Sequence, residues 1–432
     1  MMDDVCRIIS SKSPFSGECQ DICENTLFYL NREVRVLVVG AGGLGCEILK
    51  CLPYCGFKSI TVVDMDTIDA SNLNRQFLFR SADVGRAKAE VAAEFVNKRC
   101  AHLGVTVEGR VCKIQDLEMS FFSQFMIIIA GLDNIEARRW LNSTVHSLVQ
   151  KDVDGAIDKS SLRFFLDGGT EGLKGQARVI VPTRTACFEC TLETFPRVTT
   201  TFPLCTIAET PRLPEHCIEY AMTVLFEKEF PDRAFNNDNE EDIEWVFQKA
   251  SQRARDYKIS GEVSKELTKG VVKRIIPAVA STNALIAGVL VNEAFKIATF
   301  ANPVMDNYWM YMGQTGINSQ IISYERKPDC VVCDQEDVCI GFQSLESTTL
   351  EDVLNDLTQK LRFKTHPSLS CLSSGNVIYM RNPESLRVQL EPRLGMFLSQ
   401  LSDTGILVGT SLLVTAPELS RPFTVRLKLI SS

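Results

Sequence analysis

From Val36 to Gly45 the chain reads VLVVGAGGLG. Four consecutive apolar residues are typical of a strand that is buried on both faces of a parallel sheet. Gly40, Gly42 and Gly45 then follow the GxGxxG pattern that joins such a strand to a helix. Glycine lets the backbone approach a phosphate closely, and the start of the helix offers unpaired N–H groups to it. The stretch therefore predicts the first half of a nucleotide-binding βαβ unit.

The residues that follow complete this unit. We expect a helix from Cys46 to Cys55, and SITVV at 59–63 indicates a second buried strand. Asp64 ends that strand about 20 residues after the glycines, where an acidic side chain can hold the hydroxyls of a ribose. Strands and helices continue to alternate up to Val181, which is typical of a doubly wound α/β domain.

A second cluster of polar residues favours ATP over a dinucleotide. SNLNRQF at 71–77 is followed by GRAK at 85–88 and, after another apolar strand, by Asp133 and Asn134. Cleavage of a triphosphate needs cations for the leaving pyrophosphate and a carboxylate for Mg²⁺. Arg75 and Lys88 are candidates for the cations and Asp133 for the metal ligand. Taken singly, Arg75 and Lys88 could be surface charges, and Asp133 could be a helix N-cap. An NAD-dependent dehydrogenase is the alternative class of protein, and the three residues together disfavour it.

Four cysteines form two CxxC pairs, Cys187 with Cys190 and Cys330 with Cys333. Four thiolates are the tetrahedral ligand set that structural zinc prefers. Because the pairs are far apart in the sequence, a zinc ion would join the chain on either side of the segment between them. Incidental spacing is the alternative in a chain with 16 cysteines. A closed site of this kind predicts a role in stability and not in catalysis.

The composition changes between the two cysteine pairs. From about residue 197 to Lys269, polar residues, prolines and charges dominate, and we interpret this part as an inserted, mostly helical module. After it, we expect an apolar helix from Val271 to Ala298 that returns to the first domain. Cys205 lies at its start, within TFPLCTI at 201–207. A thiolate can attack an acyl adenylate, and a thiol near a helix N-terminus can have a lowered pKa. A small buried hydrophobic residue is the alternative reading of any single cysteine, and the residues alone do not choose between the two.

The last part of the chain differs from both the nucleotide-binding part and the inserted module. After Asp334, short strands are expected around one helix, Leu350 to Leu361, with strand-like runs at 376–380, 411–414 and 423–427. This order predicts a small α+β domain.

Bulk properties exclude two classes of partner. The chain has 46 Lys and Arg against 54 Asp and Glu, a net charge of −8, whereas nucleic-acid binding needs a basic face. Its longest apolar stretch, from Ile275 to Val291, contains a proline and polar residues, and a membrane span needs about 20 mostly apolar ones. The N-terminus shows no signal peptide, so we expect a cytoplasmic protein, with a nuclear share left open.

Several of these motifs resemble the adenylating family. VGAGGLG at 39–45, DMD at 64–66 and SNLNRQ at 71–76 are similar to the segments shared by thiamine- and molybdopterin-pathway enzymes and by the activating enzymes of ubiquitin-like proteins. Members adenylate the C-terminal glycine of a small β-grasp protein. FPLCTIA at 202–208 is similar to the catalytic-cysteine segment of the eukaryotic activating enzymes, and PRLPEHC at 211–217 resembles their Nedd8 branch.

The resemblance implies roles for individual residues. Arg75 and Lys88 would assist catalysis, Cys205 would be the nucleophile, and Asp133 would hold Mg²⁺. The implied ATP-binding residues are Gly40, Gly42, Gly43, Gly45, Asp64, Asp66, Asn72, Arg75, Gln76, Lys88, Asp133 and Asn134. The implied ligands of a structural Zn²⁺ are Cys187, Cys190, Cys330 and Cys333.

The resemblance also implies an architecture of three domains. A Rossmann-like adenylation domain would comprise 1–197 and 271–334, interrupted by a mostly helical catalytic-cysteine domain at 198–270. A β-grasp (ubiquitin-fold) domain at 345–432 would bind a conjugating enzyme. Because the chain has one adenylation half and the family works with two, we expect a heterodimer with a regulatory subunit whose half is inactive.

The implied activity is that of an ATP-dependent ligase for neddylation. It would adenylate Nedd8, bind it as a thioester and transfer it to a Nedd8-conjugating enzyme. Activation of another modifier such as SUMO, or a sulfur-carrier adenylyltransferase, is the alternative. Three features receive no role from the sequence, namely His216, residues 151–160 and the acidic loop 236–242.

Overall fold

The structure is a computed structural model in which two compact units can be distinguished. It describes residues 2–10, 23–150, 157–195, 211–231, 233, 235–236, 239–272, 278–299, 306–316, 318–328, 330–333, 338–372, 376–404, 406 and 410–429. One unit comprises Met1–Leu192 with Ala278–Ser432, and the other is Glu193–Pro277.

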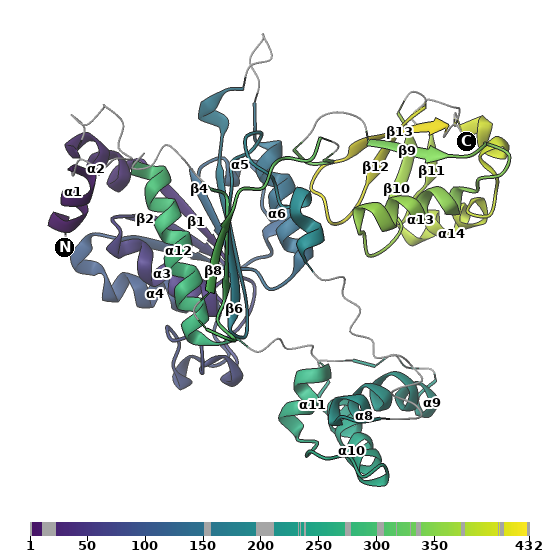
Figure 1. Ribbon diagram of the computed structural model, residues 1–432, viewed down its shortest axis with the longest axis horizontal. Coiled ribbons are helices and arrows are strands. Elements are labelled where there is room, and N and C mark those ends of the chain that lie inside the picture. The colour runs from purple at the N-terminus through teal and green to yellow at the C-terminus, as the bar shows by residue number, and fades with distance from the viewer. Residues whose placement is uncertain are drawn as a thin grey trace. The chain divides into compact units, whose positions relative to one another are not determined.

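An eight-stranded sheet forms the centre of the first unit, in the order β3-β2-β1-β4-β5-β6-β7-β8 (Figure 1). The strands from β3 to β5 in this order are parallel, and those from β5 to β8 are antiparallel. Their bounds are β1 Arg35–Val39, β2 Ser59–Val63, β3 Thr106–Arg110, β4 Ile127–Ala130, β5 Phe164–Glu171, β6 Lys174–Ile180, β7 Tyr308–Met312 and β8 Asn318–Ile322. The chain changes direction across the sheet between β1 and β4, and ligands of such sheets bind at the carboxyl ends of the strands at that point.

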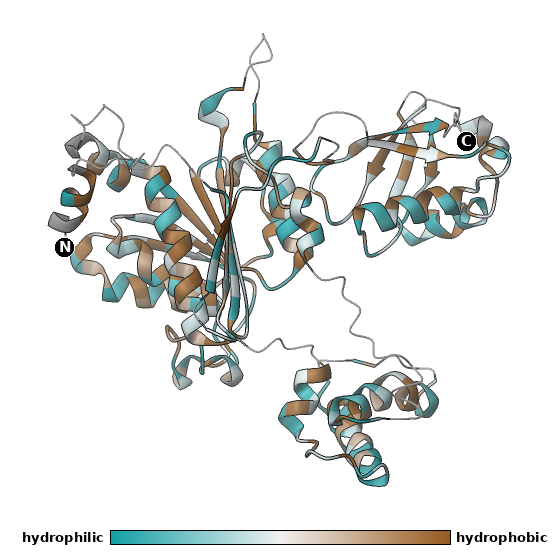
Figure 2. Ribbon diagram, in the orientation of Figure 1, coloured by the Kyte–Doolittle hydropathy of each residue, from teal (hydrophilic) through white to brown (hydrophobic). Residues whose placement is uncertain are grey.

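Helices cover both faces of this sheet. Helices α3, α4 and α12 lie on one side of the sheet, and α5 and α6 lie on the other (Figure 1). Their bounds are α1 Met2–Ser10, α2 Cys23–Arg32, α3 Gly43–Tyr54, α4 Lys88–Arg99, α5 Met119–Phe122, α6 Ile135–Ser147 and α12 Ala280–Thr299. All four residues of β4 are buried, and the central strands take the hydrophobic colour in Figure 2. Burial on both faces explains their continuous apolar sequence.

The helix expected from Val271 to Ala298 is wrong at its start. The structure ends one helix, α11 (Lys265–Val272), at Val272 and begins α12 at Ala280, while residues 273–277 lie outside the described residues. Pro277 is one of these residues in the sequence. A proline lacks the N–H that a helix interior needs, and it disfavours the α conformation of the residue before it.

The C-terminal part of the first unit has its own five-stranded sheet, in the order β11-β10-β12-β13-β9. Its elements are β9 Val338–Phe342, α13 Leu350–Leu361, β10 Ser368–Cys371, β11 Val377–Tyr379, α14 Glu384–Leu390, β12 Ser411–Thr415 and β13 Phe423–Leu429. The first strand, β9, pairs parallel with the last, β13, as in a β-grasp fold. β9 precedes residue 345, where the sequence suggested that this domain begins. Thr349 and Asp352 form a capping box at the start of α13, which matches its expected bounds.

The second unit is mostly helical. Its helices are α8 Pro214–Tyr220, α9 Phe226–Glu229, α10 Glu240–Asp256 and α11 Lys265–Val272, with a π-helical turn between α8 and α9. Cys217, Ile218, Val246 and Ala250 are fully buried in its core. The predicted α/β class, with a helical insertion and a small C-terminal domain, is confirmed.

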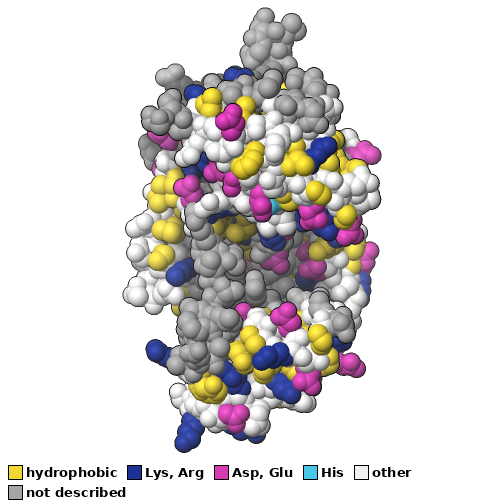
Figure 3. Space-filling model, turned by 90° about the vertical axis from the view of Figure 1, so that its right-hand side faces the viewer, with side chains coloured by type: hydrophobic (Ala, Val, Ile, Leu, Met, Phe, Trp, Pro, Cys, Tyr) yellow, Lys and Arg dark blue, Asp and Glu magenta, His cyan; other side chains and the backbone are white. Residues whose placement is uncertain are grey.

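Two further observations concern the apolar helices and the surface charges. Among the described residues, no helix combines the length and the apolar composition that crossing a membrane requires. On the face shown in Figure 3, acidic and basic side chains are interspersed.

Helix α12 offers a direct test of this packing. Leu290 is fully buried, whereas Leu285 on the same helix is 37% exposed. We expect Leu290→Ala to lower the free energy of unfolding by about 2–5 kcal/mol, because it removes buried methyl groups and leaves a cavity. Leu285→Ala is the control and should change it by less than about 0.5 kcal/mol. Denaturant unfolding measures both, and equal effects would contradict the packing of α12.

Candidate active site

The turn between β1 and α3 depends on close contacts that only glycine allows. Gly40 has a φ of 97°, and a Cβ atom on it would lie 2.8 Å from the carbonyl oxygen of Gly131, just after β4. A Cβ on Gly45 would overlap the carbonyl oxygen of Gly40. A Cβ on Gly42, in contrast, would meet no atom within 4 Å. The turn is thus closed beneath α3 and open at Gly42, where an anion can reach the helix N-terminus.

Asp64 is attached to this turn from the neighbouring strand. Its Oδ2 accepts a hydrogen bond from the Ala41 amide at 2.6 Å, and its Oδ1 accepts one from the Asp66 amide at 2.8 Å. Burial raises the pKa of Asp64 above its ordinary value, although both hydrogen bonds and the charge of Lys88 act in the opposite direction. Each carboxylate oxygen can accept a further hydrogen bond, so Asp64 retains acceptors for the hydroxyls of a ribose.

Lys88 points to the same corner from the start of α4. The residue is 8% exposed, and its Nζ lies 2.8 Å from Oδ2 of Asp66. The sequence placed both residues at the nucleotide, and the structure shows that they pair with each other. Since an ammonium group has three N–H donors, Lys88 retains donors for a phosphate.

Arg75 lies beside the glycine turn. Its Cγ would be 3.6 Å from a Cβ atom on Gly43. Its Nη1 donates to the carbonyl of Ser71 and to Oδ1 of Asn74, both at 3.0 Å. A guanidinium has five N–H donors, so these two bonds orient the group and leave others for an anion.

Asn72 and Gln76 lie in less favourable positions for a ligand. Oδ1 of Asn72 accepts from the Asp69 amide at 3.0 Å, as part of a capping box. Gln76 is 4% exposed, and its buried Oε1 has no hydrogen-bond partner among the described residues. In this arrangement the side chain of Asn72 stabilises the local turn.

Asp133 and Asn134 follow β4 and are both exposed. Oδ1 of Asn134 accepts from the Ala137 amide at 2.7 Å, so Asn134 and not Asp133 is the N-cap of α6. Asn134 also donates from Nδ2 to Oδ1 of Asp133 at 3.2 Å. The carboxylate of Asp133 is therefore held at the strand end and remains accessible to a cation.

Asn283 is a residue of this site that the sequence analysis missed. It lies on α12, is 1% exposed, and accepts a hydrogen bond from Oγ1 of Thr170 at 2.6 Å. Its Nδ2 is packed against Gly43 and has no partner among the described residues. A polar residue within the otherwise apolar stretch was the available signal, but nothing local indicates that α12 packs on the glycine turn.

The carboxyl ends of β1, β2 and β4 thus bring together the groups that a nucleotide needs. These are an open helix N-terminus, a partly buried carboxylate for ribose, two cations and an accessible carboxylate for a metal ion. Such a corner can bind a triphosphate and stabilise negative charge on a leaving pyrophosphate.

Two residues of the inserted module were singled out in the sequence, and the structure describes one of them. Cys205 lies in residues 201–210, outside the described residues. His216 is described and buried, and its Nδ1 accepts a hydrogen bond from the Arg212 amide at 3.1 Å. This bond gives His216 a structural role at the start of α8.

The two CxxC pairs come together in the first unit. The Sγ atoms of Cys187, Cys190, Cys330 and Cys333 all lie within 4.8 Å of one another, and all four residues are buried. The Sγ atom of Cys187 lies 3.4 Å from that of Cys330, and the Sγ atom of Cys190 lies 3.4 Å from that of Cys333. A disulfide needs about 2.05 Å, whereas four ligands about 2.3 Å from a tetrahedral zinc lie about 3.8 Å apart. The set therefore fits a metal ion and not two disulfides.

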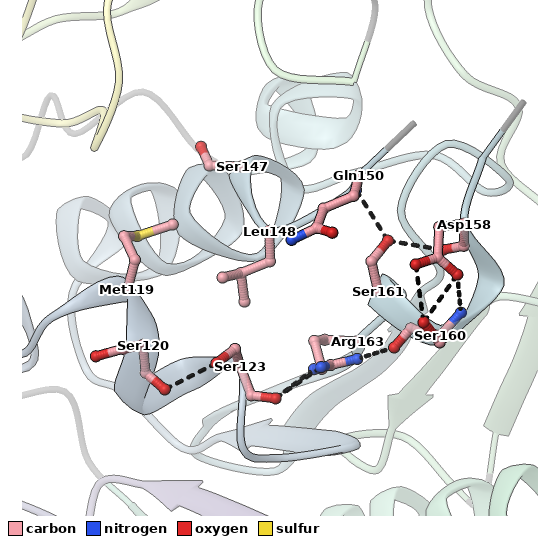
Figure 4. Close-up of a pocket in the computed structure, with 10 residues that line it drawn as sticks. All are labelled: Met119, Ser120, Ser123, Ser147, Leu148, Gln150, Asp158, Ser160, Ser161 and Arg163. Atoms are coloured by element: carbon pink, nitrogen blue, oxygen red, sulfur yellow. Dashed lines mark hydrogen bonds between the residues drawn. The ribbon is translucent and has the colours of Figure 1, made fainter. Parts of the chain in front are cut away.

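A separate cavity of about 530 Å³ opens at the opposite edge of the sheet, where β4 and β5 begin (Figure 4). Its polar groups bond to one another: Asp158 accepts from Ser160, and Arg163 donates to the carbonyls of Ser123 and Ser160. The cavity is remote from the nucleotide corner and contains part of the segment that the sequence left without a role.

Comparison with known proteins identifies relatives over nearly the whole chain. The ThiF family matches residues 19–332, and the E2 binding domain matches residues 344–429. The NEDD8-activating enzyme E1 catalytic subunit of Dictyostelium discoideum is 43% identical, covering 99% of this chain and 96% of that protein. The proteins of the same name from Drosophila melanogaster and Caenorhabditis elegans are 41% and 44% identical, covering 98% and 92% of this chain and 94% and 91% of their own length.

The open and closed sides of the glycine turn predict opposite effects of the same substitution. Gly42→Ala should change the free energy of unfolding by less than about 1 kcal/mol but lower ATP affinity at least about tenfold, because its methyl group occupies the phosphate position. Gly45→Ala should destabilise the protein by about 3 kcal/mol, because its methyl group overlaps backbone. Denaturant unfolding and calorimetric ATP titration measure the pair, and a reversed order would contradict the turn.

Burial of Asp64 predicts the pH dependence of ATP binding. A protonated carboxyl loses acceptor capacity, so ATP affinity should fall as the pH drops through the raised pKa of Asp64, at a higher pH than for an aspartate with its ordinary pKa. Asp64→Asn should weaken binding about 10- to 150-fold, from the loss of about 1.5–3 kcal/mol of charged hydrogen bonding. It should also remove this titration. An acid-side profile that is unchanged in Asp64→Asn would show that another group is responsible.

Proposed function

The chain belongs to the ThiF family and, within it, to the NEDD8-activating enzyme E1 catalytic subunits, and on this premise we propose the reaction that it catalyses. The enzyme activates the ubiquitin-like protein Nedd8 with ATP and passes it on for neddylation. The observation that carries this conclusion is the match to relatives of that name over 92% to 99% of the chain. The alternatives, another modifier or a sulfur carrier, have no comparable support.

The first step is formation of an acyl adenylate. A carboxylate oxygen of the C-terminal glycine of Nedd8 attacks the α-phosphorus of ATP, and pyrophosphate leaves. Asp64 orients the ribose, while Arg75 and Lys88 stabilise the charge that develops on the phosphates. Asp133 is the residue that would hold Mg²⁺, which neutralises phosphate charge when bound.

The second step forms a thioester on Cys205. Its thiolate attacks the acyl carbon, the bond to the phosphate oxygen breaks, and AMP leaves. The thiol proton passes to solvent before the attack, because only the thiolate is an effective nucleophile. This role of Cys205 is supported by the similarity of residues 202–208 to the catalytic segment of the family.

The third step transfers Nedd8 to a conjugating enzyme, whose cysteine attacks the thioester and releases Cys205. The match of residues 344–429 to the E2 binding domain supports docking of that enzyme on the C-terminal domain. We further propose that the chain works as a heterodimer with a regulatory subunit, since its relatives are named catalytic subunits.

We also propose a structural Zn²⁺ on the four buried cysteines. Their spacing and burial support this ligand set, and the amide of Lys327 donates to Sγ of Cys190 at 3.3 Å. The ion would join the segments before and after the helical insertion, with no part in either chemical step.

A non-reducing gel tests the reaction, the nucleophile and the modifier together. The chain and its regulatory subunit are mixed with ATP, Mg²⁺ and either Nedd8, SUMO or ubiquitin. We expect a thiol-sensitive adduct with Nedd8, because thioesters are cleaved by thiols, and no adduct in Cys205→Ala. Cys217→Ala, which alters a buried cysteine of the same unit, is the control and should retain the adduct.

Pyrophosphate exchange separates the two chemical steps in the same variants. Cys205→Ala should still exchange pyrophosphate with ATP when Nedd8 is present. A thioester on Cys205→Ala would refute the nucleophile, and an adduct with SUMO or ubiquitin alone would refute the modifier.

A further inference from the structure

The cysteine cluster and the C-terminal domain are connected by two arginines. Each CxxC turn carries, between its two cysteines, one residue that takes part in such a connection. Glu189 lies between Cys187 and Cys190, and Val332 lies between Cys330 and Cys333. The contacts therefore involve both halves of the cluster.

Arg139 makes the connection at the first CxxC turn. This residue of α6 is 1% exposed and pairs with Glu189 through two hydrogen bonds of 2.7 and 3.0 Å. It also donates to the carbonyl oxygens of Leu361 at 2.7 Å and Arg362 at 3.0 Å, at the end of α13. Because carbonyls at a helix C-terminus lack partners within the helix, a buried guanidinium is a strong partner for them.

The return contacts come from the same end of α13. Arg362 donates from Nη1 to the carbonyl of Leu192 at 2.7 Å, two residues after Cys190. Nζ of Lys364 lies 2.8 Å from Oε1 of Glu136 on α6. The exposed Lys364–Glu136 pair contributes little stability. It forms only when the C-terminal domain is docked against α6, so it can be used to detect that docking.

Arg421 makes the connection at the second CxxC turn. It precedes β13 of the C-terminal domain and donates from Nη2 to the carbonyl of Val332 at 2.6 Å. Burial lowers the pKa of its guanidinium, whereas charge on Cys330, Cys187 and Cys333 raises it. A zinc ion with four thiolates carries a net charge of −2, so the cluster attracts Arg421 more strongly when it is loaded than when its thiols are neutral.

We propose that the metal centre anchors the E2-binding domain, so that zinc holds the two CxxC turns in the positions in which Glu189 and Val332 engage Arg139 and Arg421. Without zinc, no metal ion holds the two turns together. Glu189 and Val332 can then move away from Arg139 and Arg421, and the domain is no longer held in its docked position. By linkage, contacts of the domain also stabilise the bound ion. The proposal rests on the zinc of the proposed function and adds a role for it in positioning the surface that receives the conjugating enzyme.

Zero-length cross-linking tests the proposal on the full chain without reference to activity. A carbodiimide joins Lys364 to Glu136 only when the domain is docked, and mass spectrometry measures the yield. Lys360 and Asp356, 2.7 Å apart within α13, provide an internal control. Stripping zinc with a chelator should lower the Lys364–Glu136 yield at least about fivefold, in line with typical coupling between sites. The Lys360–Asp356 yield should stay constant, and zinc should restore the first.

An unchanged Lys364–Glu136 yield in protein shown by metal analysis to be zinc-free would overturn the proposal. Absence of zinc from the protein as purified would instead refute the zinc site itself, so the two failures are distinguishable.

Variants decide the case in which chelation lowers both yields. Arg421→Ala should retain zinc but lower the Lys364–Glu136 yield and release zinc to a chromogenic chelator at least about fivefold faster. Arg421→Lys, which keeps the charge, should lie between it and the unmodified chain. Lys428→Ala removes an exposed charge from the same domain and should match the unmodified chain in both measurements. If Arg421→Ala releases zinc at the same rate as the unmodified chain and gives the same Lys364–Glu136 cross-linking yield, the proposal is wrong.

Discussion

The close approach of the backbone at Gly45 to the carbonyl oxygen of Gly40 is the constraint on which the nucleotide site depends. It sets α3 directly against the end of β1, and the similar approach of Gly40 to Gly131 sets β1 against the end of β4. With both contacts made, the α3 N-terminus, Asp64 and Asp133 lie along one edge of the sheet. A side chain at Gly40 or Gly45 would separate these elements, whereas Gly42 leaves room for the ligand.

Helix α6 joins this edge to the rest of the first unit. It begins at the N-cap Asn134, beside the candidate Mg²⁺ ligand, and its buried polar residues contact the first CxxC turn. Oδ1 of Asn142 accepts from the Phe188 amide at 3.1 Å, one position after Cys187. Burial lowers the pKa of His146 to about 4, so this residue is neutral beside the cysteines at physiological pH. One helix thus connects the adenylation corner, the metal centre and the E2-binding domain.

Features with a local pattern could be predicted from the sequence. The apolar strand, the glycine spacing and Asp64 follow one another in the chain, so their placement at one corner was expected and is observed. The cysteine pairs were recognisable by their spacing, although no local pattern shows how closely the two pairs approach each other in the fold. Strands β7 and β8 were not predicted. The aromatic and apolar sequence YWMYM of β7 was an available signal that the analysis of the chain did not use, whereas β8 is short, begins with polar residues and is mostly exposed.

Features that depend on long-range packing were missed. The return of residues 271–334 to the adenylation domain was expected, but no local pattern indicates that Asn283 is the side chain of α12 that faces the glycine turn. The Asp66–Lys88 pair was likewise not foreseen, since each residue was assigned to the ligand separately. The role of Cys205 stays a prediction, because the residue lies outside the described part of the chain.

A crystal structure of the enzyme with ATP and Mg²⁺ tests the central claim most directly. We expect ribose hydroxyls within hydrogen-bonding distance of Asp64 and a triphosphate that passes Gly42 toward Arg75 and Lys88, with Mg²⁺ on Asp133. A nucleotide bound elsewhere, or phosphates directed away from Arg75 and Lys88, would contradict it.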